Sequence, residues 1–410
     1  MNVKTHNHPV LFALVLSAFS ALGPFTVDMY LSSLPQMMND FGTNASMIQM
    51  SLTTSLLGLG LGQLVTGPLS DVYGRRKPLF ISMVLYLLAS MACAFSPNIG
   101  IFIALRFLQG FVASAGLVIS RAIVRDRYSG IEMVKFIALL TMISNVAPLI
   151  SPTAGSVVTT FTSWIGVFIF LGFLGLFLTC MTIWGMKESL PADRRVPGSV
   201  MEVVRNYGTL LRDRGFMGYA LVNGILFSGV FAYVAGTPFI YQTMYEISPQ
   251  RFSVLFALNG LGIILGSQLV KQLAGRMDER RIFRIGLLLA FITTAAILVV
   301  VLSHGPFLPL FISIFLFAVS IGIIGPVSFT LAMESQGHIA GSAAAVLGTL
   351  QFGLGAVTSP LVGIAGENSA LPFGITIFMT SILAVISYLI LVRRPAPASH
   401  LIEQRKGDPS

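Results

Sequence analysis

Long apolar stretches and short polar segments alternate along the whole chain. Twelve stretches of about 20 mostly apolar residues follow one another, which is the length that a helix needs to cross a bilayer. They are Val10–Leu34, Ser46–Thr66, Pro78–Phe95, Ile99–Ser120, Met133–Thr160, Trp164–Met186, Phe216–Tyr241, Phe252–Val270, Ile285–Ser303, Phe307–Met333, Ile339–Gly363 and Leu371–Val392. Pro35 directly follows the first stretch, and we expect it to end that helix. The pattern predicts an all-α integral membrane protein with 12 transmembrane helices.

Composition agrees with this class. The 410 residues are 55% hydrophobic and 10% charged, with a mean hydropathy of +0.84. Soluble domains carry about 25% charged residues, and disordered chains have low hydrophobicity, so both classes are excluded. The two cysteines lie within apolar stretches, so we expect no disulfide, no metal site and no cofactor.

The net charge of +9 reflects membrane topology. All but two of the 25 lysine and arginine residues fall in, or at the edge of, segments on one side of the predicted spans; the exceptions are Arg106, well within a span, and Arg251, on the other side. Basic loops face the cytoplasm, so both termini are predicted to be cytoplasmic. The basic excess therefore gives no indication of nucleic-acid binding.

The longest polar stretch separates the sixth and seventh spans and divides the chain. We expect an N-terminal six-helix bundle at residues 1–186, a cytoplasmic linker at 187–215, and a C-terminal six-helix bundle with a short tail at 216–410. Ser151-Pro152 with Gly155 recurs as Ser359-Pro360 with Gly363, which favours two related halves. Apolar residues at helical spacing between 200 and 211 fit either an interfacial helix or a solvated linker.

One carboxylate and one guanidinium lie within the predicted spans. Asp28 is seven residues before Pro35, and Arg106 is seven residues after Ile99. At 1.5 Å per residue, both lie about 10 Å below the outer ends of their helices. Buried acids of this kind mark ion pathways or proton relays, so Asp28 is a candidate proton carrier and Arg106 its candidate partner. A structural ion pair that joins two helices is the alternative.

Other residues in the spans suit packing as well as function. Tyr30, Phe231, Tyr233 and Tyr241 are candidates for lining a substrate pocket together with Asp28, although aromatic residues commonly serve packing alone. Pro148, Pro152 and Gly155 make the fifth span bendable, as a gate requires.

The loop after the second span has a distinctive spacing. It reads Gly67-Pro-Leu-Ser-Asp71-Val-Tyr-Gly74-Arg75-Arg-Lys77. A short basic loop explains Arg75 to Lys77 but leaves the spacing of the glycines and the aspartate unexplained. The chain has no phosphate-binding Gly-Lys-Ser/Thr loop, so ATP is not its expected energy source, and it has no nucleophile–base cluster that predicts an enzyme.

Three segments resemble the major facilitator superfamily. Gly67–Lys77 resembles the signature between helices two and three, and Arg106–Gly110 resembles the helix-four signature. Asn145–Gly155 is similar to the helix-five signature of drug/proton antiporters, with Ser151-Pro152 in place of the usual Gly-Pro. The layout of 12 spans extends this resemblance to the whole chain.

A narrower resemblance is to the Bcr/CflA drug-efflux branch. Three segments show this resemblance: Asp28–Leu31, Ala235–Gln242 and Ala340–Ala343. Ser32 occupies a position where that branch often has proline. The resemblance implies the export of small antimicrobials, such as bicyclomycin, amphenicols or sulfonamides, in exchange for protons. We expect a monomer in the bacterial inner membrane.

The resemblance also implies roles for residues. Asp28 would be the coupling acid and Arg106 the residue that tunes it, while Asp71, Arg75 and Asp126 would form a cytoplasmic latch. A proton-coupled exporter or importer of a small metabolite on the same fold is the alternative function.

Overall fold

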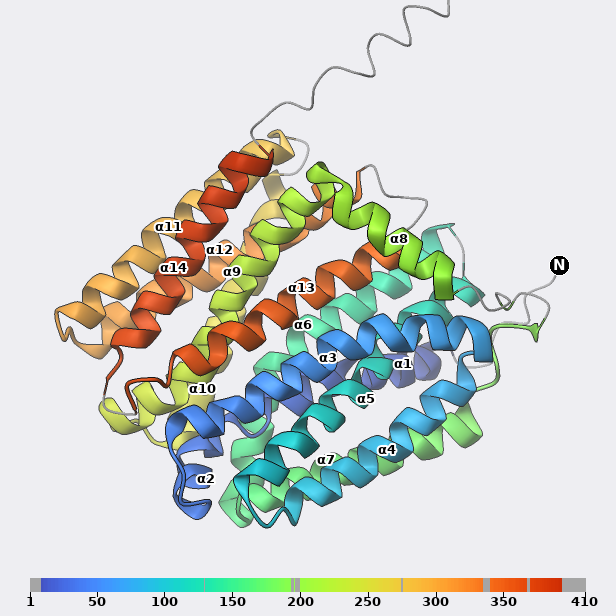
Figure 1. The fold of residues 1–410 in the computed structure, drawn as a ribbon, viewed down its shortest axis with the longest axis horizontal. Helices are drawn as coiled ribbons and strands as arrows, with labels where there is room; N and C mark the ends of the chain where they lie inside the picture. The colour runs from blue at the N-terminus through green and yellow to red at the C-terminus, as the bar shows by residue number, and fades with distance from the viewer. Residues whose placement is uncertain are drawn as a thin grey trace, which may run out of the picture.

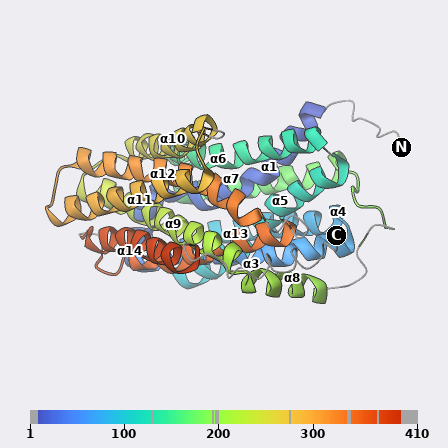
Figure 2. The same cartoon turned by 90° about the horizontal axis from the view of Figure 1, so that it is seen from above.

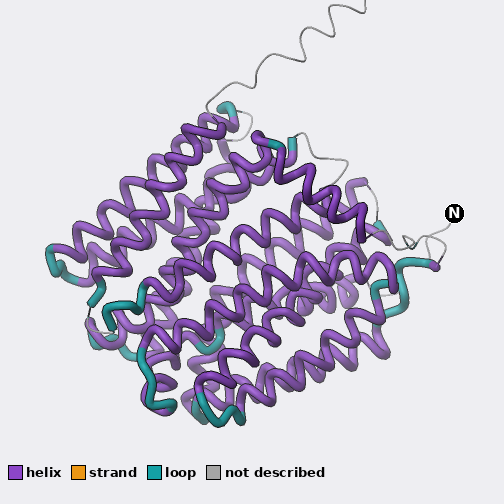
Figure 3. The backbone as a smooth tube through the Cα atoms, viewed as in Figure 1, coloured by secondary structure: helices purple, strands orange, loops and turns teal. Residues whose placement is uncertain are grey.

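The computed structural model describes residues 9–128, 130–192, 195, 200–273, 276–334, 340–366 and 369–392. Within these ranges, long helices lie side by side (Figure 1) and are joined by short loops (Figure 3). The helices are α1 (Pro9–Asp28), α2 (Leu34–Asp40), α3 (Ala45–Tyr73), α4 (Arg76–Ala94), α5 (Ile99–Arg127), α6 (Gly130–Phe161), α7 (Trp164–Cys180), α8 (Val200–Arg212), α9 (Arg214–Phe239), α10 (Pro249–Leu273), α11 (Glu279–Leu302), α12 (Phe307–Met333), α13 (Ala340–Leu361) and α14 (Leu371–Ser387). The chain ends, expected in the cytoplasm, lie outside the described residues.

Several long helices continue into short turns of different pitch. The 3-10 turn η1 (Leu31–Ser33) joins α1 to α2. The π-helical turns extend α7, α9 and α14; they are η2 (Met181–Gly185), η4 (Ile240–Met244) and η6 (Tyr388–Val392).

Among the described residues, 11 helices are long and apolar enough to cross a membrane. The remaining predicted span, Met133–Thr160, falls on α6, within which Val146–Phe161 is a shorter apolar helix. Large apolar side chains such as Phe173 and Leu288 are exposed on the outside of the helices, where a bilayer would cover them.

The first span departs from its predicted form. Its helix ends at Asp28, and the chain passes through η1 into α2, so the span consists of two helices rather than one. The expectation that Pro35 ends the span was wrong. Pro35 lies in the first turn of α2. The first N–H groups of a helix have no partner within it, so the missing N–H of proline costs no hydrogen bond there.

Short polar side chains begin several of the long helices. The Asn44 side chain accepts a hydrogen bond of 2.9 Å from the N–H of Met47 in α3, and Asn98 does the same for Ile101 in α5. Asp213 accepts from Gly215 at 2.8 Å at the start of α9. Each bond pairs an N–H group that the helix itself leaves free, which fixes where the helix begins.

The helices pack in two groups. Helices α1 to α7 contact one another, as do α9 to α14, and the pairs α3–α13 and α6–α10 join the groups (Figures 1 and 2). The predicted linker contains α8, which contacts α9 and α13.

Four hydrogen bonds between described residues connect the two groups. Three lie near the helix ends that we expect outside the cytoplasm, and one lies deeper. They are Gln49 Nε2 to Ala235 O at 3.2 Å, Gln242 Nε2 to Ser32 O at 3.3 Å, Ser253 Oγ to Pro152 O at 3.1 Å, and the deeper Thr349 Oγ1 to Gly60 O at 3.1 Å. Among the residues that the structure describes, these hydrogen bonds between the groups are therefore concentrated at one end.

Candidate proton and substrate site

Asp28 is the last residue of α1 and is only 6% exposed. The η1 turn that follows it packs against α6, α9 and α10, so this break lies where the two groups of helices meet. The last carbonyl groups of a helix have no partner within it and carry partial negative charge. An ionised carboxylate at this place therefore faces an unfavourable environment from its own helix.

Arg106 of α5 lies beside the break and is fully buried. Its Nη2 donates to the carbonyl oxygen of Thr26 at 2.8 Å, and its Nη1 donates to Gln109. The guanidinium also lies over the Tyr30 ring, 4.4 Å from the ring centre. The arginine thus satisfies a carbonyl near the end of α1, although its Nε has no hydrogen-bond partner.

Asp28 and Arg106 form no ion pair within 4.0 Å, and both belong to the described part of the chain. They are near enough for the arginine to act electrostatically on the carboxylate. The carboxylate therefore keeps a positive charge nearby without a direct bond to it, an arrangement in which a proton can be added or removed without breaking a salt bridge.

The four aromatic candidates separate into three places. Tyr30 packs against Phe168, 5.6 Å between ring centres, and its hydroxyl pairs with Ser51 at 2.9 Å, all within the first group of helices. Phe231 packs against Phe352 of α13 at 5.5 Å. Only Tyr233 and Tyr241 come together.

Tyr233 and Tyr241 both lie beside Asn259 of α10. The amide nitrogen of Asn259 donates to the Tyr233 hydroxyl at 3.2 Å, and the Tyr241 hydroxyl approaches the same amide. We call these three residues the Asn259 cluster. Tyr233 is also within the electrostatic reach of Asp28. Asn259 was not among the predicted site residues; a search for amides within the apolar stretches would have found it.

Gly155 of α6 lies against the break in α1. A Cβ atom at this position would collide with the carbonyl oxygen of Met29, the residue after Asp28. Pro152 lies one turn earlier, where its carbonyl accepts the bond from Ser253 of α10. The α6 segment that was expected to bend therefore contacts both the Asp28 break and the second group of helices.

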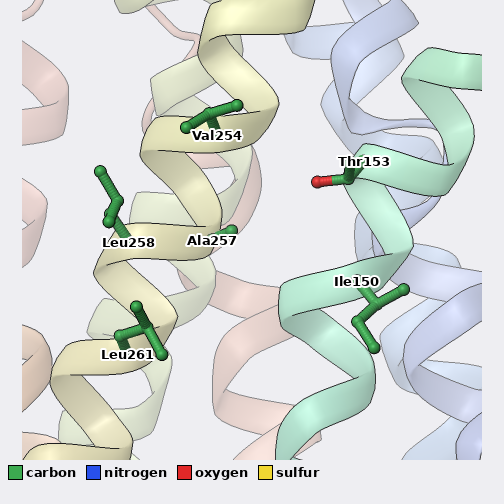
Figure 4. A pocket seen from close by; sticks show the side chains of 6 residues that line it. All are labelled: Ile150, Thr153, Val254, Ala257, Leu258 and Leu261. Carbon is green, nitrogen blue, oxygen red and sulfur yellow. The ribbon is translucent and has the colours of Figure 1, made fainter.

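A groove of about 330 Å³ lies between α6 and α10. Figure 4 shows its lining, which is apolar except for Thr153: Ile150, Thr153, Val254, Ala257, Leu258 and Leu261. Pro148, within the same stretch of α6, is half-buried. The groove does not include Asp28, and nothing in its lining suits proton chemistry.

At the other end of the first group, Arg75 joins two carboxylates. Its Nη1 lies 2.5 Å from Asp71, and its Nε donates to Asp126 at 2.8 Å. We call Asp71, Arg75 and Asp126 the Arg75 cluster. Burial tends to lower the pKa of Arg75, but Asp126 and Asp71 raise that pKa above its ordinary value. Gly67 lies nearby in α3, where an added Cβ would lie 3.6 Å from the side chain of Val118 of α5.

Glu188, at the start of the predicted linker, holds the same loop and was missed by the sequence analysis. Its carboxylate accepts from the backbone N–H groups of Arg75 at 2.8 Å and Arg76 at 3.2 Å, at the start of α4. Gly74 has φ +86°, and a Cβ there would lie 2.5 Å from Glu188 Oε2. The glycine in this signature thus provides both the turn and the space for the carboxylate.

The hydrogen bonds of Glu188 determine its protonation. Burial tends to raise the pKa of this carboxyl, but the N–H groups of Leu190, Arg75 and Arg76 and the charge of Arg195 lower it more. The net pKa of Glu188 therefore lies below its ordinary value.

Comparison with known proteins places this geometry in a family. Residues 14–360 match the Major Facilitator Superfamily. The chain is 46% identical to the uncharacterised MFS-type transporter YdgK of Bacillus subtilis, over 95% of this chain and 97% of that protein. It is 28% identical to a chloramphenicol resistance protein of Pseudomonas aeruginosa, over 93% of this chain and 90% of that protein.

The fold also matches a solved transporter. The xylose transporter XylE of E. coli, in a partially occluded inward open conformation, superposes with a TM-score of 0.70 at 14% identity, over 93% of this chain and 98% of that one. With a family match across most of its length, the protein is a membrane-embedded transporter that belongs to the Major Facilitator Superfamily.

Proposed function

We propose that the protein is a proton-coupled antiporter of the bacterial inner membrane that exports small antimicrobial compounds. The observation that carries this proposal is the position of Asp28: buried, at the end of an interrupted helix, between the two groups of helices, and without a salt bridge. Related proteins named for drug resistance, among them the chloramphenicol resistance protein, support the substrate class.

The transport cycle follows from this position. When the site faces outward, Asp28 takes up a proton; when the site faces inward, a drug binds close by and the proton leaves to the cytoplasm. Arg106 favours release because a positive charge stabilises the ionised carboxylate. A membrane potential contributes about 2.3 kcal/mol per charge for each 100 mV, and the pH gradient adds to this.

The two ends of the molecule have different roles in this proposal. The three hydrogen bonds at the expected outer end hold it closed while the site faces the cytoplasm. The Arg75 cluster, near the expected cytoplasmic end, acts as the latch of the opposite state. Gly155 and Pro152 transmit bending of α6 to the Asp28 break.

Inverted membrane vesicles with an acidic interior test the proposal. Added chloramphenicol should collapse the pH gradient, read with a pH-sensitive dye, in vesicles that contain the wild type and fail to do so with Asp28→Asn. Asp278→Asn, outside the candidate spans, is the matched control and should behave like the wild type. Drug-dependent proton movement that survives Asp28→Asn would reject the coupling role.

A further inference from the structure

Asn259 is a buried amide with half of its hydrogen-bonding capacity unused. It is 1% exposed, and its Nδ2 donates to Tyr233, but its Oδ1 accepts no hydrogen bond. An unpaired polar atom of this kind is unfavourable, and a membrane interior offers no bulk water as a substitute. A packing role alone does not explain why an unpaired oxygen is kept at this place.

A second unpaired group lies beside it. The Tyr241 hydroxyl approaches the Asn259 amide but forms no hydrogen bond, and Tyr241 is fully buried. The Tyr233 ring, whose hydroxyl accepts from Asn259, stacks on Phe256 at 5.3 Å between ring centres. The unpaired oxygen and the unpaired hydroxyl therefore lie close to each other among aromatic rings.

The Asn259 cluster belongs to the same region as Asp28. Tyr233 lies within the electrostatic reach of the Asp28 carboxylate, and η1, directly after Asp28, packs against α9 and α10, the helices that carry Tyr233 and Asn259. A molecule bound beside Asp28 would meet the unpaired oxygen of Asn259. Both groups accept hydrogen bonds, so the molecule must supply donors.

We propose that Asn259 is the residue that selects substrates, and that it favours neutral compounds with hydroxyl groups. The inference rests on the proposed function, because it assumes that substrate binds near Asp28. The Oδ1 of Asn259 accepts a hydrogen bond from the substrate, and the Tyr241 hydroxyl donates or accepts a second hydrogen bond. A site that pairs a substrate donor with a buried acceptor discriminates strongly against an analogue that lacks the donor.

Binding to the purified full-length protein tests this directly. Chloramphenicol carries two hydroxyl groups, and its 1,3-diacetate has both of them blocked. Isothermal titration calorimetry should show the wild type binding chloramphenicol about tenfold more tightly than the diacetate. Asn259→Leu should reduce this preference to less than about twofold, mainly by weakening the binding of chloramphenicol.

Asn223 of α9 offers a matched control. It is also a buried asparagine of the second group, 3% exposed, with an unpaired Oδ1. Asn223→Leu should keep the tenfold preference if the effect belongs to the Asn259 position. If Asn259→Leu does not fold, Asn259→Ala replaces it, with thermal unfolding as the check.

The outcomes separate the two proposals. A wild type with no preference, or equal loss of preference in Asn259→Leu and Asn223→Leu, overturns the role of Asn259 and leaves proton coupling to be judged by the vesicle assay. If the preference depends on Asn259 but chloramphenicol moves no protons in vesicles, the antiport proposal fails and the selectivity role stands.

Discussion

Arg106 donates its hydrogen bond to the carbonyl oxygen of Thr26, not to the carboxylate of Asp28. The buried positive charge is thus held by backbone at the end of α1, by Gln109 and by the Tyr30 ring. This arrangement keeps the arginine in place whether or not the nearby acid is protonated.

Replacing Arg106 by lysine should destabilise the protein although it keeps the charge. A lysine has no planar fork to bond Thr26 and Gln109 together and stacks less well on Tyr30. We expect a loss of roughly 2 kcal/mol or more, because hydrogen bonds to charged groups contribute about 1.5–3 kcal/mol each. The midpoint of thermal unfolding of the purified protein measures the effect. The exposed Arg125 provides the control Arg125→Lys, and equal stability of the two variants would contradict the assigned role.

Gly155→Ala should be destabilising because its Cβ meets the Met29 carbonyl oxygen. The backbone of α6 or of the break must shift, and overpacking of this kind costs about 1–3 kcal/mol. Gly353 of α13 has no atoms near its Cβ position, so Gly353→Ala should leave stability unchanged or raise it by about 0.5–1 kcal/mol. Thermal unfolding of the two variants side by side gives the comparison; a harmless Gly155→Ala would mean that the close contact is dispensable.

Glu188 should make stability depend on pH. Its pKa is lower in the folded protein than the ordinary value of 4.5, so the ionised form stabilises the fold above about that pH. This stabilisation disappears as the pH falls through the lowered folded pKa. Wild type should therefore exceed Glu188→Gln in thermal stability at neutral pH, and the difference should shrink below pH 4.5. A difference that stays constant down to pH 3.5 would assign the effect to packing rather than to charge.

Gln49→Ala should open the expected outer end. The variant removes the bond from Gln49 to Ala235, and a bond of about 0.5–1.5 kcal/mol changes a two-state population by roughly two- to twelvefold. Ala235→Cys, at a fully buried position and in a background without Cys93 and Cys180, reports the opening through its reaction rate with a membrane-impermeant maleimide.

Thr349→Val serves as the control for that experiment. It removes the deeper bond between the groups, to Gly60, so labelling of Ala235→Cys should stay at the wild-type rate. Equal acceleration by both variants would show that the bonds are not specific to one end.

Much of the fold was predictable because apolar runs of membrane length leave little choice of structure. Eleven of the predicted spans coincide with helices long enough to cross a bilayer, and the linker pattern between 200 and 211 does form a helix, α8. The break after Asp28 was not predictable from apolar content, since Met29, Tyr30 and Leu31 suit a continuous helix equally well. The break depends on tertiary contacts. Gly155 leaves space for the carbonyl oxygen of Met29, and Arg106 donates a hydrogen bond to the carbonyl oxygen of Thr26.

The candidate site residues were found in two ways. Asp28 and Arg106 stood out because ionised groups are conspicuous within apolar spans, whereas Asp71, Arg75 and Asp126 were named from the family resemblance. Neutral amides such as Asn259 carry no such signal. Which aromatic rings meet depends on helix rotation, and the structure separates Tyr30 from Tyr233 for that reason.

The two-piece first span has a mechanical consequence. Its inner helix, α1, contacts α5 and α6, while the outer pieces, η1 and α2, also contact α9. This one segment of backbone therefore contacts both groups of helices, and Asp28 lies where its two helices meet. Any rotation of one group against the other would change the backbone torsion angles of Met29 and Tyr30, and this change would reorient the Asp28 carboxylate. The coupling would run through the backbone itself and would need no relay of side-chain contacts.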